Sequence, residues 1–189
     1  MKARENPFRS EQVGRLAYRF AQGSMDQLCT ALEQKKWRGA IVGPKGTGKT
    51  LLMDELQPRI AAAGYTVKRI RLDESHPTFS RRFLDDFAGQ IRSGDVILFD
   101  GAEQMSAMVW MRFRWSVRRA GGMVITCHRP GRLPTLLKTR TSPQLLEDLV
   151  KQLAGPTAPD RAECERLFAA HHGNIRNALR EFYDIYAAR

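Results

Sequence analysis

The sequence predicts an α/β protein, a three-layer sandwich with a parallel sheet of about five strands and a small C-terminal helical unit. Over residues 37–141, short apolar runs alternate with amphipathic helical segments, which is the pattern of βαβ units with right-handed crossovers. Residues 142–189 are helical in pattern throughout. The expected organisation is therefore a lead-in with a short helix at 1–36, a core at 37–141 and a helical lid at 142–189.

Residues 1–23 are polar with scattered aromatics and are expected to be extended. Ser24 and Gln27 form a capping pair that predicts the start of a short helix reaching about Lys36. The apolar run from Trp37 to Val42 then breaks at glycine, which is typical of a buried strand before a tight turn.

The remaining core elements follow from the same periodicities. Pro58 lies inside the first helical segment and is expected to kink or shorten it. The run at 95–100 is nearly all apolar, as expected for a central strand of a parallel sheet. In order, the predictions are a helix at 48–63, a strand at 65–72, a helix at 79–91, a strand at 95–100, a helix at 103–119, and strands at 122–127 and 133–139.

The C-terminal segment carries clear helix boundaries. Ser142 followed by Pro143 predicts a capped start with proline in the first turn. Gly155-Pro156 closes that helix, Pro159 opens a second one, and Gly173-Asn174 precedes a last helix of about fifteen residues.

Composition limits the classes of protein. The 189 residues are 42% hydrophobic and 27% charged, which indicates a globular chain. No apolar run approaches the ~18 residues that span a bilayer, and the charged start lacks the apolar stretch of a secretory signal. A cytoplasmic protein with no membrane partner is therefore expected. The three cysteines (Cys29, Cys127 and Cys164) are too widely spaced for a disulfide framework or a zinc knuckle.

The strongest chemical signal is the run Gly43-Pro44-Lys45-Gly46-Thr47-Gly48-Lys49-Thr50, which matches G-x-x-x-x-G-K-[ST] in full. It follows a predicted strand and opens a predicted helix. Glycines let the backbone approach phosphates, and successive N–H groups with the helix N-terminus form an anion site. The run predicts binding of a nucleoside triphosphate, most simply ATP with Mg²⁺.

Two residues of this loop and one strand residue have specific expected roles. Lys49 would reach the β- and γ-phosphates, and the Thr50 hydroxyl would ligate Mg²⁺. Asp100 ends a buried apolar strand, where a carboxylate is costly without a partner. A magnesium ion beside the phosphate loop would be that partner, and a turn cap at Gly101 is the alternative.

The residues that would act on the γ-phosphate are less fixed by the pattern. Glu103 is the nearest carboxylate after Asp100; it is interpreted either as the base that activates water or as an acid that complements a helix dipole. Thr126, or His128 just beyond it, ends the following strand and would face the γ-phosphate, unless Thr126 is only a strand former.

The net charge of +11 would attract phosphate-rich partners, with nucleic acid first among them. The positive residues are spread along the chain. The base composition of the gene is therefore an alternative explanation of the net charge. Within the predicted helix 103–119, arginines at 112, 114, 118 and 119 indicate an anionic partner, an arginine finger toward a neighbouring subunit, or a solvated face.

Together these features resemble the AAA+ ATPases of the ASCE class, with Gly43–Thr50 similar to Walker A and 96–100 similar to Walker B. The stretch 172–179, His-Gly-Asn-Ile-Arg-Asn-Ala-Leu, resembles the sensor 2 segment of the AAA+ lid. By that likeness, Arg176 would reach the γ-phosphate. Gly101 stands where these ATPases usually carry the glutamate that polarises water. The chain also resembles small bacterial P-loop proteins for which no role is defined.

The leading hypothesis is an ATPase that couples ATP binding and hydrolysis to lid motion and to action on a protein or nucleic-acid partner. A homo-oligomer is a further expected assembly. A nucleotide-dependent switch with little turnover is the alternative that Gly101 favours. A small-molecule phosphotransferase is the third, because kinases share the phosphate loop.

Overall fold

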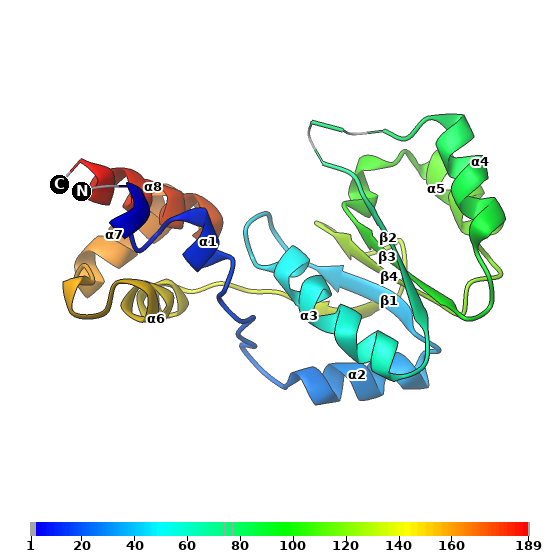
Figure 1. The fold of residues 1–189 in the computed structure, drawn as a ribbon, viewed down its shortest axis with the longest axis horizontal. Helices are drawn as coiled ribbons and strands as arrows, with labels where there is room; N and C mark the ends of the chain where they lie inside the picture. The colour runs from blue at the N-terminus through cyan, green and yellow to red at the C-terminus, as the bar shows by residue number, and fades with distance from the viewer. Residues whose placement is uncertain (1–2, 74, 77, 189) are drawn as a thin grey trace. The chain divides into compact units, whose positions relative to one another are not determined.

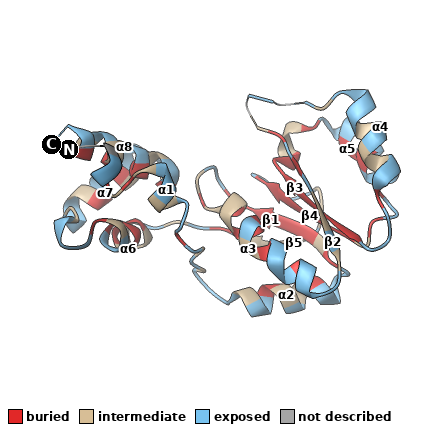
Figure 2. Cartoon of the chain, in the orientation of Figure 1, coloured by how far each residue is buried: buried red, intermediate tan, exposed pale blue. Residues whose placement is uncertain are grey.

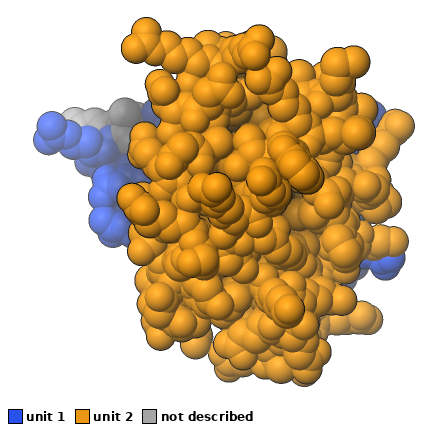
Figure 3. All heavy atoms as spheres, turned by 90° about the vertical axis from the view of Figure 1, so that its right-hand side faces the viewer, with its two compact units in different colours: residues 1–21, 44–48, 140–189 blue, residues 22–43, 49–139 orange. Residues whose placement is uncertain are grey.

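The computed structural model describes residues 3–73, 75–76 and 78–188. The chain forms two compact units, coloured separately in Figure 3. The sheet unit comprises residues 22–43 and 49–139, and the helical unit comprises residues 1–21, 44–48 and 140–189. The predicted lead-in of 1–36 is therefore divided between the units, and five residues of the phosphate loop, Pro44–Gly48, belong to the helical unit.

The sheet unit is built on five parallel strands in the order β2-β3-β4-β1-β5, which confirms the predicted α/β class and strand number. β3 and β4 are buried along their whole length (Figure 2), and for β3 this confirms the central position that its apolar run predicted. The strands are β1 (Arg38–Val42), β2 (Thr66–Arg71), β3 (Asp95–Asp100), β4 (Gly122–Cys127) and β5 (Thr135–Lys138).

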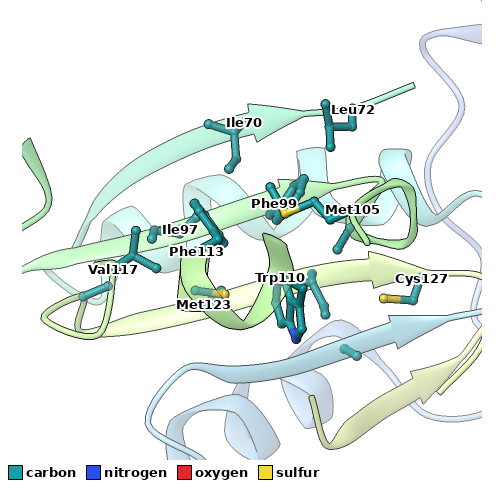
Figure 4. Close-up of a cluster of buried hydrophobic side chains, with 14 of the residues drawn as sticks. Ile70, Leu72, Ile97, Phe99, Met105, Trp110, Phe113, Val117, Met123 and Cys127 are labelled. Carbon is teal, nitrogen blue, oxygen red and sulfur yellow. The ribbon is translucent and has the colours of Figure 1, made fainter. Parts of the chain in front are cut away.

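Helices cover both faces of this sheet (Figure 1). Ile97 and Phe99 of β3 join the core cluster that includes Trp110 and Phe113 of α5 (Figure 4). Because side chains alternate along a strand, Val96 and Leu98 point to the opposite face, where α3 packs. The helices of the unit are α2 (Met25–Gln34), α3 (Lys49–Ala62), α4 (Arg81–Gln90) and α5 (Ala107–Ser116).

In the sheet unit the helix that contains Pro58 has the predicted span, whereas one predicted helix start is wrong. α3 runs from Lys49 past Pro58 to Ala62, so the expected shortening by the proline does not occur. A proline removes one ladder hydrogen bond, whereas α3 fully buries leucine and isoleucine side chains on both sides of it. The helix predicted at 103–119 begins only at Ala107, because the Ser106 hydroxyl accepts a hydrogen bond from the Val109 N–H.

The helical unit contains α1 (Ser10–Val13), α6 (Pro143–Ala154), α7 (Arg161–Ala170) and α8 (Ile175–Ala187), with short 3₁₀ turns at Ala3–Glu5 and Gly155–Thr157. The Ser142 hydroxyl caps α6 by accepting from the Leu145 N–H at 3.1 Å, with Pro143 in the first turn, as predicted. These elements enclose a second apolar core.

The lead-in is not simply extended and polar, which corrects the sequence prediction. It contains a 3₁₀ turn and α1, and Phe8 and Leu16 are buried in the helical core. The Phe8 ring stacks on Phe182 with centroids 5.3 Å apart. Asn6 holds the lead-in against α8. Its side chain donates to the Tyr183 carbonyl at 2.8 Å and accepts from the Phe8 N–H.

Within the described ranges, no helix is long and apolar enough to cross a membrane. The three cysteines are free thiols, in keeping with the absence of disulfide spacing in the sequence. Burial raises the pKa of the Cys164 thiol in the helical core to about 11.

The contribution of the lead-in can be measured with Phe8→Ala. Removing a buried aromatic ring costs about 3 kcal/mol or more in free energy of unfolding, and we expect that loss in chemical denaturation followed by circular dichroism. Arg15→Ala is the matched control, since its ion pair with Glu11 is exposed and worth only a few tenths of a kcal/mol. Equal stability of the two variants would contradict a packed lead-in.

Candidate functional site

The phosphate loop connects the end of β1 at Val42 with the start of α3 at Lys49. Gly46 has a left-handed backbone with φ of 79°. A Cβ at Gly46 would overlap the side-chain amide of Asn174, so a side chain here would displace that amide as well as strain the backbone. The Thr47 hydroxyl donates to the Pro44 carbonyl at 2.9 Å. The strand–loop–helix context that the motif requires is therefore present.

Lys49 is the first residue of α3, and its side chain is buried. Its Nζ donates to the Gly43 carbonyl at 2.7 Å, so the ammonium group folds back on the loop. The first turn of α3 contains no acidic residue. The positive end of the helix dipole and the lysine therefore act together at this loop, an arrangement that attracts anions.

Asp100 is held by two hydroxyl groups from different elements. Thr50 Oγ1 donates to one carboxylate oxygen at 2.8 Å, and Thr126 Oγ1 donates to the other at 2.6 Å. Arg71 Nε lies 3.9 Å from the oxygen that Thr50 binds. The buried carboxylate is thus hydrogen-bonded at both oxygens.

The Thr126 hydroxyl makes a second contact, because it accepts a hydrogen bond from the Gly101 N–H at 2.8 Å. Thr126 ends β4 in a buried position. Its hydroxyl therefore links the carboxylate of Asp100 to the first peptide group after β3. The sequence offered Thr126 or His128 to face the γ-phosphate, or Thr126 as a strand former only, and it did not anticipate this link.

Gly101 occupies a position that excludes other residues. Its φ is 84°, and a Cβ there would overlap the Leu72 carbonyl oxygen, which belongs to the backbone. A glutamate directly after Asp100 would therefore combine a strained backbone with a clash that no rotamer relieves. Any carboxylate that acts beside Asp100 must come from a position other than 101.

Glu103 lies on the 3₁₀ turn Ala102–Gln104, ahead of the α5 cap at Ser106. It is therefore outside the first turn of α5, where an acid complements the helix dipole. Its Oε1 lies 3.1 Å from His128 Nε2, and among the described residues its buried Oε2 has no hydrogen-bond partner. A buried oxygen without a partner is rare and is a feature of reactive sites.

Cys127 lies within electrostatic reach of these groups. Burial first, and then the Glu103 carboxylate, raise the pKa of its thiol to about 12, against the opposing effect of Arg132 and Lys49. The thiol therefore stays protonated at neutral pH and is not a nucleophile.

Two residues of the helical unit, Asn174 and Tyr18, lie beside its part of the loop. Asn174 lies against Gly46, and its side chain caps α8 by accepting from the Asn177 N–H at 3.2 Å. Arg176 follows in the first turn of α8 and is exposed. A Cβ on Gly48 would lie 3.1 Å from the Tyr18 ring. No periodicity or motif in the sequence indicated Tyr18.

The oxygen donors of Thr50 and Asp100 are of the type that Mg²⁺ prefers. Among the residues that the structure describes, no group of three or more His, Cys, Asp or Glu side chains could hold an ion. The hydroxyl of Thr50 and the carboxylate of Asp100 are instead a small set of hard donors. Mg²⁺ uses such a set when phosphates and water complete its octahedron.

The sheet order and the strand–loop–helix context of Gly43–Thr50 define an α/β fold of the P-loop type. Three structures of Thermotoga maritima RuvB variants are similar to this chain, with TM-scores of 0.54, 0.55 and 0.52 and identities of 16%, 17% and 18%. The matches cover 83%, 87% and 83% of this chain and only 59%, 61% and 58% of RuvB. No protein-family model and no curated protein sequence matches the chain. At these identities the likeness shows the fold alone.

The link through Thr126 can be tested by substitution. Thr126→Val keeps the shape but leaves the Gly101 N–H and one Asp100 oxygen without a partner, and we expect a loss of about 2 kcal/mol or more in unfolding free energy. Thr126→Ser keeps the hydroxyl and should lose about 1 kcal/mol, the worth of a buried methyl. Chemical denaturation compares them, and a serine variant no better than valine would refute the link.

Proposed function

We propose that the chain binds ATP with Mg²⁺ on the loop Gly43–Thr50, hydrolyses it, and couples these steps to its helical unit. The observation that carries the proposal is the 2.8 Å hydrogen bond from Thr50 Oγ1 to Asp100, beside a buried Lys49 at the start of α3. This is the donor arrangement that a magnesium-bound triphosphate requires.

In the proposed complex, the N–H groups of the loop and the α3 dipole hold the phosphates. Lys49 Nζ exchanges the Gly43 carbonyl for phosphate oxygens. Thr50 and Asp100 hold Mg²⁺, which neutralises charge that develops on the phosphates. Thr126 keeps the Asp100 carboxylate oriented, since its hydroxyl is fixed by the Gly101 N–H.

Glu103 is the proposed base for hydrolysis. His128 holds one of its oxygens at 3.1 Å, which leaves the buried Oε2 to accept a proton. Water would attack the γ-phosphorus, its proton would pass to Glu103, and ADP would leave. The Oε2 atom supports this role for Glu103, because a carboxylate oxygen without a partner gains a hydrogen bond when water enters the site.

Coupling to the helical unit is supported by the division of the phosphate loop, most of which belongs to that unit. Residues 44–48 pack within the helical unit, where Gly46 lies against Asn174. A phosphate bound by the loop would therefore be felt at the start of α8, where Arg176 is the proposed sensor. The net charge of +11 supports an anionic partner, and a protein, nucleic acid or second copy of the chain are the proposed candidates.

A nucleotide-dependent switch with little turnover is the second candidate. It is favoured by Gly101, whose geometry excludes a carboxylate at the position directly after Asp100. In this case Glu103 would only anchor His128, and ATP binding rather than hydrolysis would change the helical unit.

Nucleotide binding is tested by Lys49→Ala. Loss of a buried charge that contacts the phosphates should cost about 2–5 kcal/mol, at least about thirtyfold in ATP affinity measured by calorimetry. Lys35→Ala removes an exposed lysine at the end of α2 and is the matched control. ATP affinity that is the same in both variants would refute the proposed site.

Hydrolysis is tested by Glu103→Gln, which keeps the size of the side chain and removes the base. We expect phosphate release to fall by about 10² or more, with ATP affinity retained, because a positioned base contributes that much. Glu33→Gln, at an exposed site on α2, should leave turnover unchanged. Slow turnover that Glu103→Gln does not alter would instead identify the switch.

A further inference from the structure

Helix α5 is apolar on two opposite sides. Trp110 and Phe113 are buried in the sheet core, and Val117 continues that side just after the helix. Met108, Met111 and Trp115 are exposed at 82%, 69% and 67%. At about 100° per residue, these three share one stripe that faces away from the core. We call them the α5 face.

Arginines surround the α5 face. Residues 107–119 contain four arginines, at 112, 114, 118 and 119, and no acidic residue. The Arg118 guanidinium lies 4.2 Å from the centre of the Trp115 ring. The nearby acids on α4 are already close to arginines, since Asp85 lies within 3.9 Å of Arg81 and Arg112. The border of the face is therefore positively charged.

Three adjacent large apolar side chains on one helix are more than the scattered exposure of an ordinary surface. Trp, Met and Arg are the residue types enriched in protein interfaces, where the aromatic or Met anchors fill the centre and charges form the rim. The α5 face has that composition and that order.

We propose that the α5 face binds an acidic amphipathic helix of another protein. Apolar side chains of the partner would pack between Met108, Met111 and Trp115 as ridges pack into grooves. Its carboxylates would pair with Arg114 and Arg118 at the rim, which makes the charge complementary. This proposal is independent of ATP binding.

Charge and shape favour this occupant over two others. A second copy placed face to face would bring two sets of arginines together, which costs free energy. Single-stranded nucleic acid would use the arginines and one tryptophan, but methionines contribute neither stacking on bases nor a contact with phosphates. Flexible methionine side chains are instead suited to the apolar ridge of a peptide.

The test uses the full chain and a displayed library of random peptides about 16 residues long, four helical turns. Selection on the wild type is followed by counter-selection on Met108→Gln/Met111→Gln/Trp115→Gln, whose exposed positions allow it to fold. We expect the recovered peptides to be rich in Asp and Glu, with apolar residues at helical spacing. Trp115→Gln should weaken a recovered peptide about tenfold or more.

Matched variants then test whether the arginines contribute to binding, and quenching tests where the peptide binds. Arg114→Gln/Arg118→Gln should weaken binding and reduce its salt dependence, whereas Arg15→Gln/Arg161→Gln removes the same charge at exposed sites elsewhere and should not. Acrylamide quenching locates the peptide, because Trp115 is exposed while Trp37 and Trp110 are buried. A bound peptide should protect Trp115.

Several results would overturn the proposal. Recovered peptides without acidic enrichment, or peptides that bind the triple variant equally well, would remove the acidic helix as occupant. Protection of Trp115 by an oligothymidine in place of the peptides would identify a nucleic-acid surface. Protection that rises with the concentration of the chain alone would identify self-association, and recovery of no peptide would leave the face without a helical partner.

Discussion

The site depends on one buried carboxylate. Asp100 ends a strand that is buried throughout, and a carboxylate there is tolerated only with partners at both oxygens. Thr50 from α3 and Thr126 from β4 supply them. Because the carboxyl ends of parallel strands meet at one edge of a sheet, these contacts join the phosphate-loop helix to two neighbouring strands there.

This constraint also explains where a catalytic carboxylate can lie. The Thr126 hydroxyl receives the Gly101 N–H, and the chain turns in the left-handed region against the Leu72 carbonyl. The tight turn that satisfies Asp100 therefore excludes a side chain at 101. Glu103, on the next turn of backbone, is the first carboxylate free of that restriction, and His128 at the end of β4 orients it. The proposed base therefore lies two residues beyond the position that the turn excludes.

The sheet and the phosphate loop were predictable because their signals are local. Strand runs, the Ser142-Pro143 start and the Gly43–Thr50 spacing each specify backbone geometry within a few residues. The start of α5 and the burial of Phe8 were not predicted correctly. In α5 the serine cap overrides an apolar pattern that continues on both sides of it. Phe8 is buried by aromatic side chains more than 170 residues away, Phe182 among them, and no local period records such a contact.

Helix α5 has apolar side chains on two opposite sides, and only one of these sides is covered within this chain. A helix that is apolar on opposite sides is normally buried on both. The sheet covers Trp110 and Phe113, whose spacing in the sequence is that of one buried helix side. Met108, Met111 and Trp115 lie on the opposite side, in solvent beside arginines. Because the stripe is exposed, it does not stabilise the fold of this chain, and the proposed acidic helix would account for its composition.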